Sequence, residues 1–74
     1  MNEQNENASP YMILFGNIKS LCDKKGISIS KLEKECGFGQ GTIYKWKRVS
    51  PALVNLQKVA DYFKVTINKL VKTS

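Results

Sequence analysis

The chain has 74 residues, enough for one domain and close to the lower size limit for a hydrophobic core that folds without help. Its formal charge is +6, and because Glu3 and Glu6 lie among the first residues, the remainder carries twelve basic side chains against four acidic ones. The absence of histidine, the presence of only two cysteines and the lack of a long apolar run exclude a zinc shell, a disulfide framework and a membrane-spanning helix.

The first helix is predicted to follow a disordered tail. Residues 1–9 are rich in asparagine, glutamine and glutamate and lack apolar periodicity, so we assign them to the tail and residues 10–74 to one domain. Ser9-Pro10 is typical of a helix start, and Gly26 of a helix end. The 3.6-residue period between them predicts a buried face made of Tyr11, Leu14, Phe15, Ile18, Leu21 and Cys22.

A second, short helix is predicted after Gly26. Ser28 or Ser30 caps it: Ser30 would form a capping box with Glu33, whereas Ser28, which we favour, would bring Ile29 into the first turn. The helix is predicted to end at Gly37, with Phe38 filling the core in the turn that follows. Its inner face is predicted to consist of Ile29, Leu32 and Cys36.

Three further elements complete the prediction. Ile43 and Trp46 lie three residues apart and predict a short helix around residues 40–48, with Trp46 in the core rather than in base stacking. Ser50-Pro51 predicts the start of a fourth helix, and Thr66 caps a fifth. The buried faces of these last two helices are predicted to be Leu53, Leu56, Val59, Ala60 and Phe63, and then Ile67, Leu70 and Val71. Five helices without a strand predict the all-α class.

The remaining polar and thiol groups point to no chemistry. There is no Ser/His/Asp set and no glycine-rich phosphate loop after a strand, so we expect no enzyme, no cofactor, no metal and no small-molecule substrate. Cys22 and Cys36 lie on apolar stripes and are predicted to be buried free thiols in a reducing cytoplasm, with a redox switch as the alternative. We expect the acids after the tail to be solvated: Asp23, Glu33, Glu35 and Asp61.

The segment 27–48 carries the functional prediction. Two short helices joined by a tight turn are typical of a helix-turn-helix, whose second helix enters the major groove of DNA. Gln40 can pair with adenine and Lys45 with guanine, while Tyr44 can contact a thymine methyl or a phosphate. The N-terminus of this helix is expected to point its N–H groups at phosphate. The alternative is that these side chains form an ordinary solvated helix face.

Three segments also carry a family resemblance: ISISKLEKECGF (27–38), GTIYKW (41–46) and LQKVADYFKV (56–65). Together with Pro51 they resemble the lambda-repressor-like (Cro/CI-type) domain over about residues 13–72, in the form found in repressors of Gram-positive prophages and mobile elements. The resemblance implies a five-helix fold that binds a palindromic operator in double-stranded DNA as a homodimer. It also implies a cytoplasmic, nucleoid-associated repressor encoded by a bacterium or phage.

Site residues follow from the reading of the helix and from this resemblance. The residues predicted to read bases are Gln40, Gly41, Thr42, Tyr44 and Lys45. The residues predicted to contact the DNA backbone are Ser28, Ser30, Gly39, Lys47, Arg48 and Ser50.

The chain departs from the family pattern in three places. Ile29 replaces a glutamine that many members keep, and the loop between Trp46 and Pro51 is two residues shorter, which removes groups that would contact the DNA backbone. Many members pair a buried arginine with a glutamate where this chain has Cys22 and Lys47. Since both charges are replaced together, we expect Cys22 to pack as a small hydrophobe and Lys47 to face solvent and phosphate.

Two alternatives from other classes are a protein-interaction module similar to antitoxins and a binder of anionic membrane surfaces. The first predicts that Ile67, Leu70 and Val71 are exposed for a partner; the second predicts one exposed apolar face opposite the basic residues. Tyr62 fits either the core or a dimer contact. The chain is either a complete small regulator or the DNA-binding part of a longer one, and in the second case we expect a weakly binding monomer.

Overall fold

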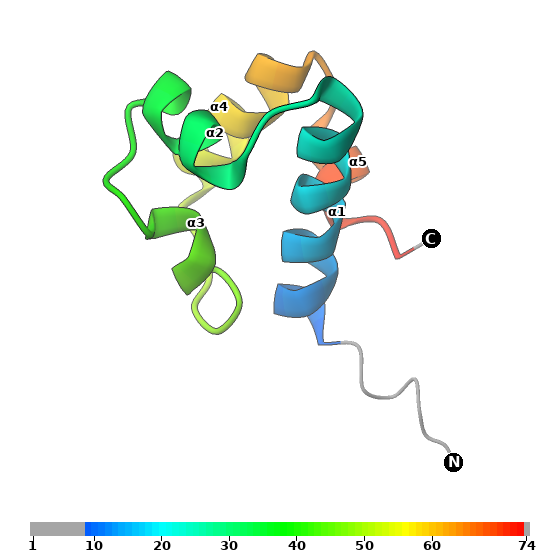
Figure 1. Cartoon of the computed structure of the whole chain (residues 1–74). Coiled ribbons are helices and arrows are strands. Elements are labelled where there is room, and N and C mark those ends of the chain that lie inside the picture. The colour runs from blue at the N-terminus through cyan, green and yellow to red at the C-terminus, as the bar shows by residue number, and fades with distance from the viewer. Residues whose placement is uncertain (1–8, 74) are drawn as a thin grey trace.

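The computed structural model describes residues 9–73 and contains no strand among them (Figure 1). Its helices are α1 (Pro10–Lys25), α2 (Ile29–Cys36), α3 (Thr42–Lys45), α4 (Leu53–Phe63) and α5 (Ile67–Val71). The predicted five-helix, all-α fold is therefore confirmed. The predicted disordered tail falls on residues 1–8, outside the described residues, apart from Ser9, which caps α1.

Local signals set most of the helix ends. The hydroxyl of Ser9 accepts a hydrogen bond from the amide of Met12, at 3.2 Å, and that of Ser28 accepts one from Lys31, at 3.0 Å. The choice of Ser28 over Ser30 as the cap of α2 is thus confirmed. Gly26 and Gly37 end α1 and α2 in the left-handed conformation, each with φ 76°, which glycine adopts without steric cost.

The predicted start of α4 at Ser50-Pro51 is wrong. The helix begins at Leu53, after an extended Ala52 (φ −67°, ψ 148°) whose carbonyl accepts the first helical hydrogen bonds, from the amides of Asn55 and Leu56. A proline ring fixes φ near −65°, a value that suits both the first turn of a helix and an extended connection. The Ser-Pro signal therefore could not distinguish the two.

The predicted helix around residues 40–48 is shorter than expected. Only Thr42–Lys45 is α-helical. The next residues form turns of the 3₁₀ type, since the amides of Lys47 and Arg48 donate to carbonyls three residues earlier. We call residues 40–48 the recognition segment. It consists of one α-helical turn with a hydrogen-bonded turn on each side.

The core confirms most of the predicted faces and corrects their ends. The buried hydrophobic residues are Leu14, Ile18, Cys22, Ile29, Leu32, Ile43, Trp46, Val59, Ala60 and Leu70. Tyr11 and Leu53, predicted to be buried, are 36% and 69% exposed, and Val71 is 45% exposed. All three lie in the first or last turn of a helix. There the apolar pattern of the sequence continues, but the fold provides no neighbouring residues that would bury these side chains. Cys36 is only partly buried.

Asn17, in the middle of α1, links this helix to the end of α5 by hydrogen bonds. Its side-chain amide donates to the carbonyls of Leu70 and Lys72, at 2.7 and 2.8 Å, and so satisfies acceptors that the end of a helix leaves without partners. Figure 1 shows α5 packed behind α1, and the two helices are in contact. Within residues 9–73, no helix combines the length and apolarity needed to cross a bilayer.

Candidate nucleic-acid interface

The pair α2 and α3, joined by residues 37–41, forms the predicted helix-turn-helix. In Figure 1, α3 lies below α2 at the edge of the molecule, and an open turn leads from it toward α4. Gly41 precedes α3 with φ 86°, a conformation that a side chain would strain. The turn thus needs glycine at this position to change direction before the recognition segment continues.

Two large side chains anchor the recognition segment to the core. Ile43 is fully buried and Trp46 is 3% exposed. The ring of Phe38 meets Trp46 edge-on, with 5.6 Å between ring centroids, a favoured aromatic geometry. The predicted core position of Trp46 is confirmed, whereas Phe38 is partly buried and packs against the core. Burial leaves no indole face of Trp46 available for base stacking.

The predicted base-reading residues lie together on the outer side of this anchored segment. Gln40 and Lys45 are exposed and Tyr44 is 47% exposed, whereas Gly41 and Thr42 are half-buried. Gln40 also lines a cavity of about 350 Å³ whose other walls include Ser30 and Lys34 of α2. Helix α2 and the start of the recognition segment thus share one surface.

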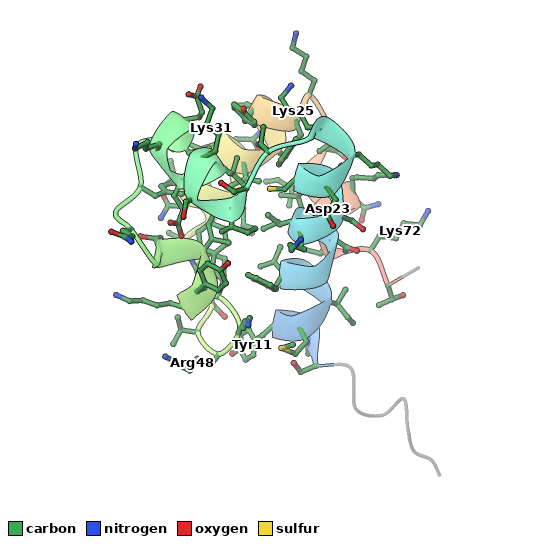
Figure 2. The ribbon with its side chains drawn as sticks, in the orientation of Figure 1. Tyr11, Asp23, Lys25, Lys31, Arg48 and Lys72 are labelled. Atoms are coloured by element: carbon green, nitrogen blue, oxygen red, sulfur yellow. The ribbon has the colours of Figure 1, made fainter. Side chains whose placement is uncertain are left out.

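The predicted backbone contacts are less concentrated. Gly39 and Arg48 are exposed on either side of α3, and Figure 2 shows Arg48 at the lower end of the molecule, opposite Lys31. Ser28 and Ser50 are exposed but belong to other segments: Ser28 is the N-cap of α2, and Ser50 lies in the connection to α4.

The rings of Tyr44 and Phe15 of α1 contact each other, and the ammonium group of Lys47 makes cation–π contacts with both. The rings of Phe15 and Tyr44 have centroids 5.4 Å apart, and the ammonium of Lys47 lies 4.7 Å from the Phe15 centroid and 5.4 Å from that of Tyr44. Lys47 is solvent-exposed, as predicted, but its charge rests on two aromatic faces rather than extending freely. Sequence reasoning missed this role of Phe15, which helps to hold Tyr44 in place from another helix.

The prediction for Glu33 is wrong. It is 2% exposed, and its carboxylate accepts hydrogen bonds from the amide of Gly41, at 3.0 Å, and from that of Ile43, at 2.9 Å. The sequence contained a signal for this position: Glu33 follows Ile29 by four residues and Leu32 by one, which is the inward face of α2.

The occupation of these amides also corrects the expected phosphate site at the start of α3. The amides of Gly41 and Ile43 donate to Glu33, and that of Thr42 donates to the carbonyl of Gly39 at 3.2 Å. Because these three amides already have partners inside the protein, they are not free to donate to a phosphate.

Positive charge is left uncompensated along the recognition segment. Residues 37–52 contain Lys45, Lys47 and Arg48 and no acid. Elsewhere, Asp23 pairs with Lys19 and Glu35 with Lys31, but within residues 9–73 no ion pair involves the three cations of this segment. The surface therefore presents a positive potential together with exposed hydrogen-bonding groups, a combination that suits nucleic acid.

The two cysteines are free, as predicted. Burial raises the pKa of both the Cys22 and the Cys36 thiol, which keeps them protonated and unreactive near neutral pH. Cys22 is completely buried in the core. It packs as a small hydrophobe, as expected.

Comparison with protein families agrees with this geometry. Residues 17–74 match the model of the Cro/C1-type HTH (helix-turn-helix) DNA-binding domain. The chain belongs to this family. No curated protein and no solved structure matches it. The resemblance to Cro/CI-type domains is confirmed, and the protein is a Cro/C1-type DNA-binding regulator. Its origin in a Gram-positive prophage stays a prediction.

Proposed function

We propose that this Cro/C1-type protein is a sequence-specific repressor that reads the major groove of double-stranded DNA with residues 40–48. The observation that carries the proposal is the recognition segment itself. It is anchored from below by Ile43 and Trp46, lacks acids, and presents Gln40, Tyr44 and Lys45 outward.

The chemistry of each exposed side chain decides which part of the DNA it contacts. Gln40 pairs with an adenine and Lys45 with a guanine, because their donors and acceptors match the edges of these bases in the major groove. Arg48 and Ser30 contact phosphates, which provide affinity and its salt dependence but no discrimination. Tyr44 contacts Phe15 and Lys47 and remains 47% exposed, so that it is available to DNA together with the base-reading pair.

Repression follows from occupancy of a promoter. A homodimer bound to an inverted repeat would place two recognition segments one helical turn apart on the same face of the duplex. Such a dimer excludes polymerase without needing a catalytic group. In this proposal the protein acts in the bacterial cytoplasm, on the nucleoid, and derives from a phage or prophage.

The structure gives less support to the interaction-module alternative. That alternative requires Ile67, Leu70 and Val71 to be exposed together, but Leu70 is fully buried and Ile67 is partly buried against the core. Only Val71 is exposed, at 45%.

The proposal is tested by alanine variants at a duplex selected from a random library. Gln40→Ala and Lys45→Ala should each lose about 1–3 kcal/mol of binding free energy at that duplex and little on random DNA, while Arg48→Ala should weaken both alike. Lys24→Ala is the matched control. It removes an equal charge from an exposed site on α1 that is distant from the recognition segment. Phe15 is the residue of α1 that contacts this segment, and Lys24 lies nine residues, or about 13 Å, further along the helix. Equal losses on both duplexes for Gln40→Ala and Lys45→Ala would contradict base reading.

A further inference from the structure

Glu33 is the only acidic or basic side chain of residues 9–73 that is buried, at 2% exposed. No lysine or arginine in the described part of the chain forms an ion pair with it. A buried carboxylate is costly unless strong hydrogen bonds compensate for lost hydration. Here each carboxylate oxygen accepts one backbone amide, from Gly41 and from Ile43.

These two hydrogen bonds supply what α3 lacks. The helix has four residues, and its own N-cap, Gly41, has no side chain that could accept from the first turn. One helical turn has too few internal hydrogen bonds to be stable in isolation. The carboxylate caps α3 from another helix, and because its two oxygens hold amides two residues apart, it restricts both the rotation and the translation of α3 relative to α2.

We propose that Glu33 is the positioning residue of the recognition segment: it sets how Gln40, Tyr44 and Lys45 are presented to DNA, and by occupying two amides it prevents phosphate from binding the start of α3. This inference rests on the proposed function. Glu33 contacts no base in this scheme, since it lies beneath the reading surface, and it acts through the backbone that carries the reading side chains.

Charge and position predict opposite effects when this carboxylate is neutralised. Removing a negative charge close to DNA strengthens binding on electrostatic grounds alone. Glu33→Gln keeps the size of the side chain but turns one of the two acceptors into an N–H donor that faces another N–H donor. A displaced α3 therefore weakens binding at a cognate duplex, whereas the loss of charge alone would strengthen it. The sign of the change in affinity separates the two effects.

Binding should be measured for Glu33→Gln and for Glu35→Gln at a selected duplex and at a random duplex. Glu35 is the matched control, because it lies two residues away on α2 with an exposed carboxylate 3.3 Å from Lys31. We expect Glu33→Gln to lose about tenfold at the selected duplex and nothing on random DNA, and Glu35→Gln to lose nothing on either. Val59→Ala, a core truncation in α4, controls for lower stability and should keep its selected-site affinity at temperatures where it is folded.

Amide hydrogen exchange without DNA tests the same inference independently of DNA binding, and its wild-type measurement does not depend on the folding of any variant. In the wild-type protein, the Gly41 and Ile43 amides should be protected, and in Glu33→Gln they should exchange at least about tenfold faster, with no change in Glu35→Gln. A wild-type protein that selects no duplex would refute the proposed function but leave this measurement decisive. Unprotected amides in the wild type, or equal losses of selected-site affinity in Glu33→Gln and Val59→Ala, would overturn the positioning role.

Discussion

Replacing Trp46 with alanine separates support of the recognition segment from contact with DNA. Trp46 is 3% exposed, so its side chain buries an apolar surface of about 200 Å². The substitution by alanine removes most of this buried surface. At about 25 cal/mol per Å², the lost burial is about 5 kcal/mol, and comparable truncations of buried aromatic residues cost about 3–5 kcal/mol. The edge-on contact with Phe38 is lost as well.

This loss is large compared with the stability of so small a domain. At about 0.05–0.15 kcal/mol per residue, the whole domain has a free energy of unfolding of about 3–10 kcal/mol. Trp46→Ala should therefore lose about a third or more of the wild-type free energy of unfolding, and its urea midpoint should fall accordingly. Urea denaturation followed by far-UV circular dichroism measures this, since the variant lacks the single tryptophan that fluorescence would use.

The neighbouring Tyr44 provides the contrast. It is 47% exposed, so Tyr44→Ala should cost less than about 1 kcal/mol of stability while weakening DNA binding. The opposite pattern would contradict a supporting role for Trp46: a Trp46→Ala protein within about 1 kcal/mol of wild-type stability that no longer binds DNA would make Trp46 a DNA-contacting residue.

Three further predictions concern the core. Cys22→Arg places an unpaired charge at a fully buried position and should cost about 3–5 kcal/mol, so an unchanged or raised melting temperature would contradict it. Asn17→Ala removes the hydrogen bonds to Leu70 and Lys72 and should cost about 1–3 kcal/mol, with faster exchange of the α5 amides; equal exchange in both proteins would disprove the link. Burial raises the pKa of the Cys22 thiol above its ordinary value, so as the pH rises through that ordinary value the unfolded chain releases a proton that the folded chain keeps, and stability falls. In urea titrations, the stability advantage of the wild type over Cys22→Ala should therefore shrink as the pH rises above about 8.5, and a constant difference would contradict the raised pKa.

Features that depend on neighbouring residues were predictable from the sequence. Ser9, Ser28 and Thr66 accept hydrogen bonds from amides three residues later, and Gly26 and Gly37 end helices through their own backbone conformation. Each signal acts within one turn of helix, where residue type decides the structure. The Ser50-Pro51 signal failed because the fixed φ of proline fits an extended connection as well as a helix.

Features that depend on distant segments could not be predicted in the same way. Glu33 was expected to be solvated because of its residue type, but its position on the inward face of α2 brings it under amides eight and ten residues later. Lys47 was expected to face solvent and phosphate; it is exposed, and its ammonium also lies over the ring of Phe15, 32 positions earlier in the chain. In both cases tertiary packing supplied the partner that decides where a charged group lies.

The central claim is that residues 40–48 read DNA sequence. Its most direct test is selection from a random duplex library at about 0.1 M salt, carried out in parallel with the wild type and the double variant Gln40→Ala/Lys45→Ala. We expect an enriched inverted repeat with half-sites about one helical turn apart for the wild type, and loss of preference at specific positions within each half-site for the variant. The same enriched motif from both proteins, or no motif from a folded wild type, would contradict this claim.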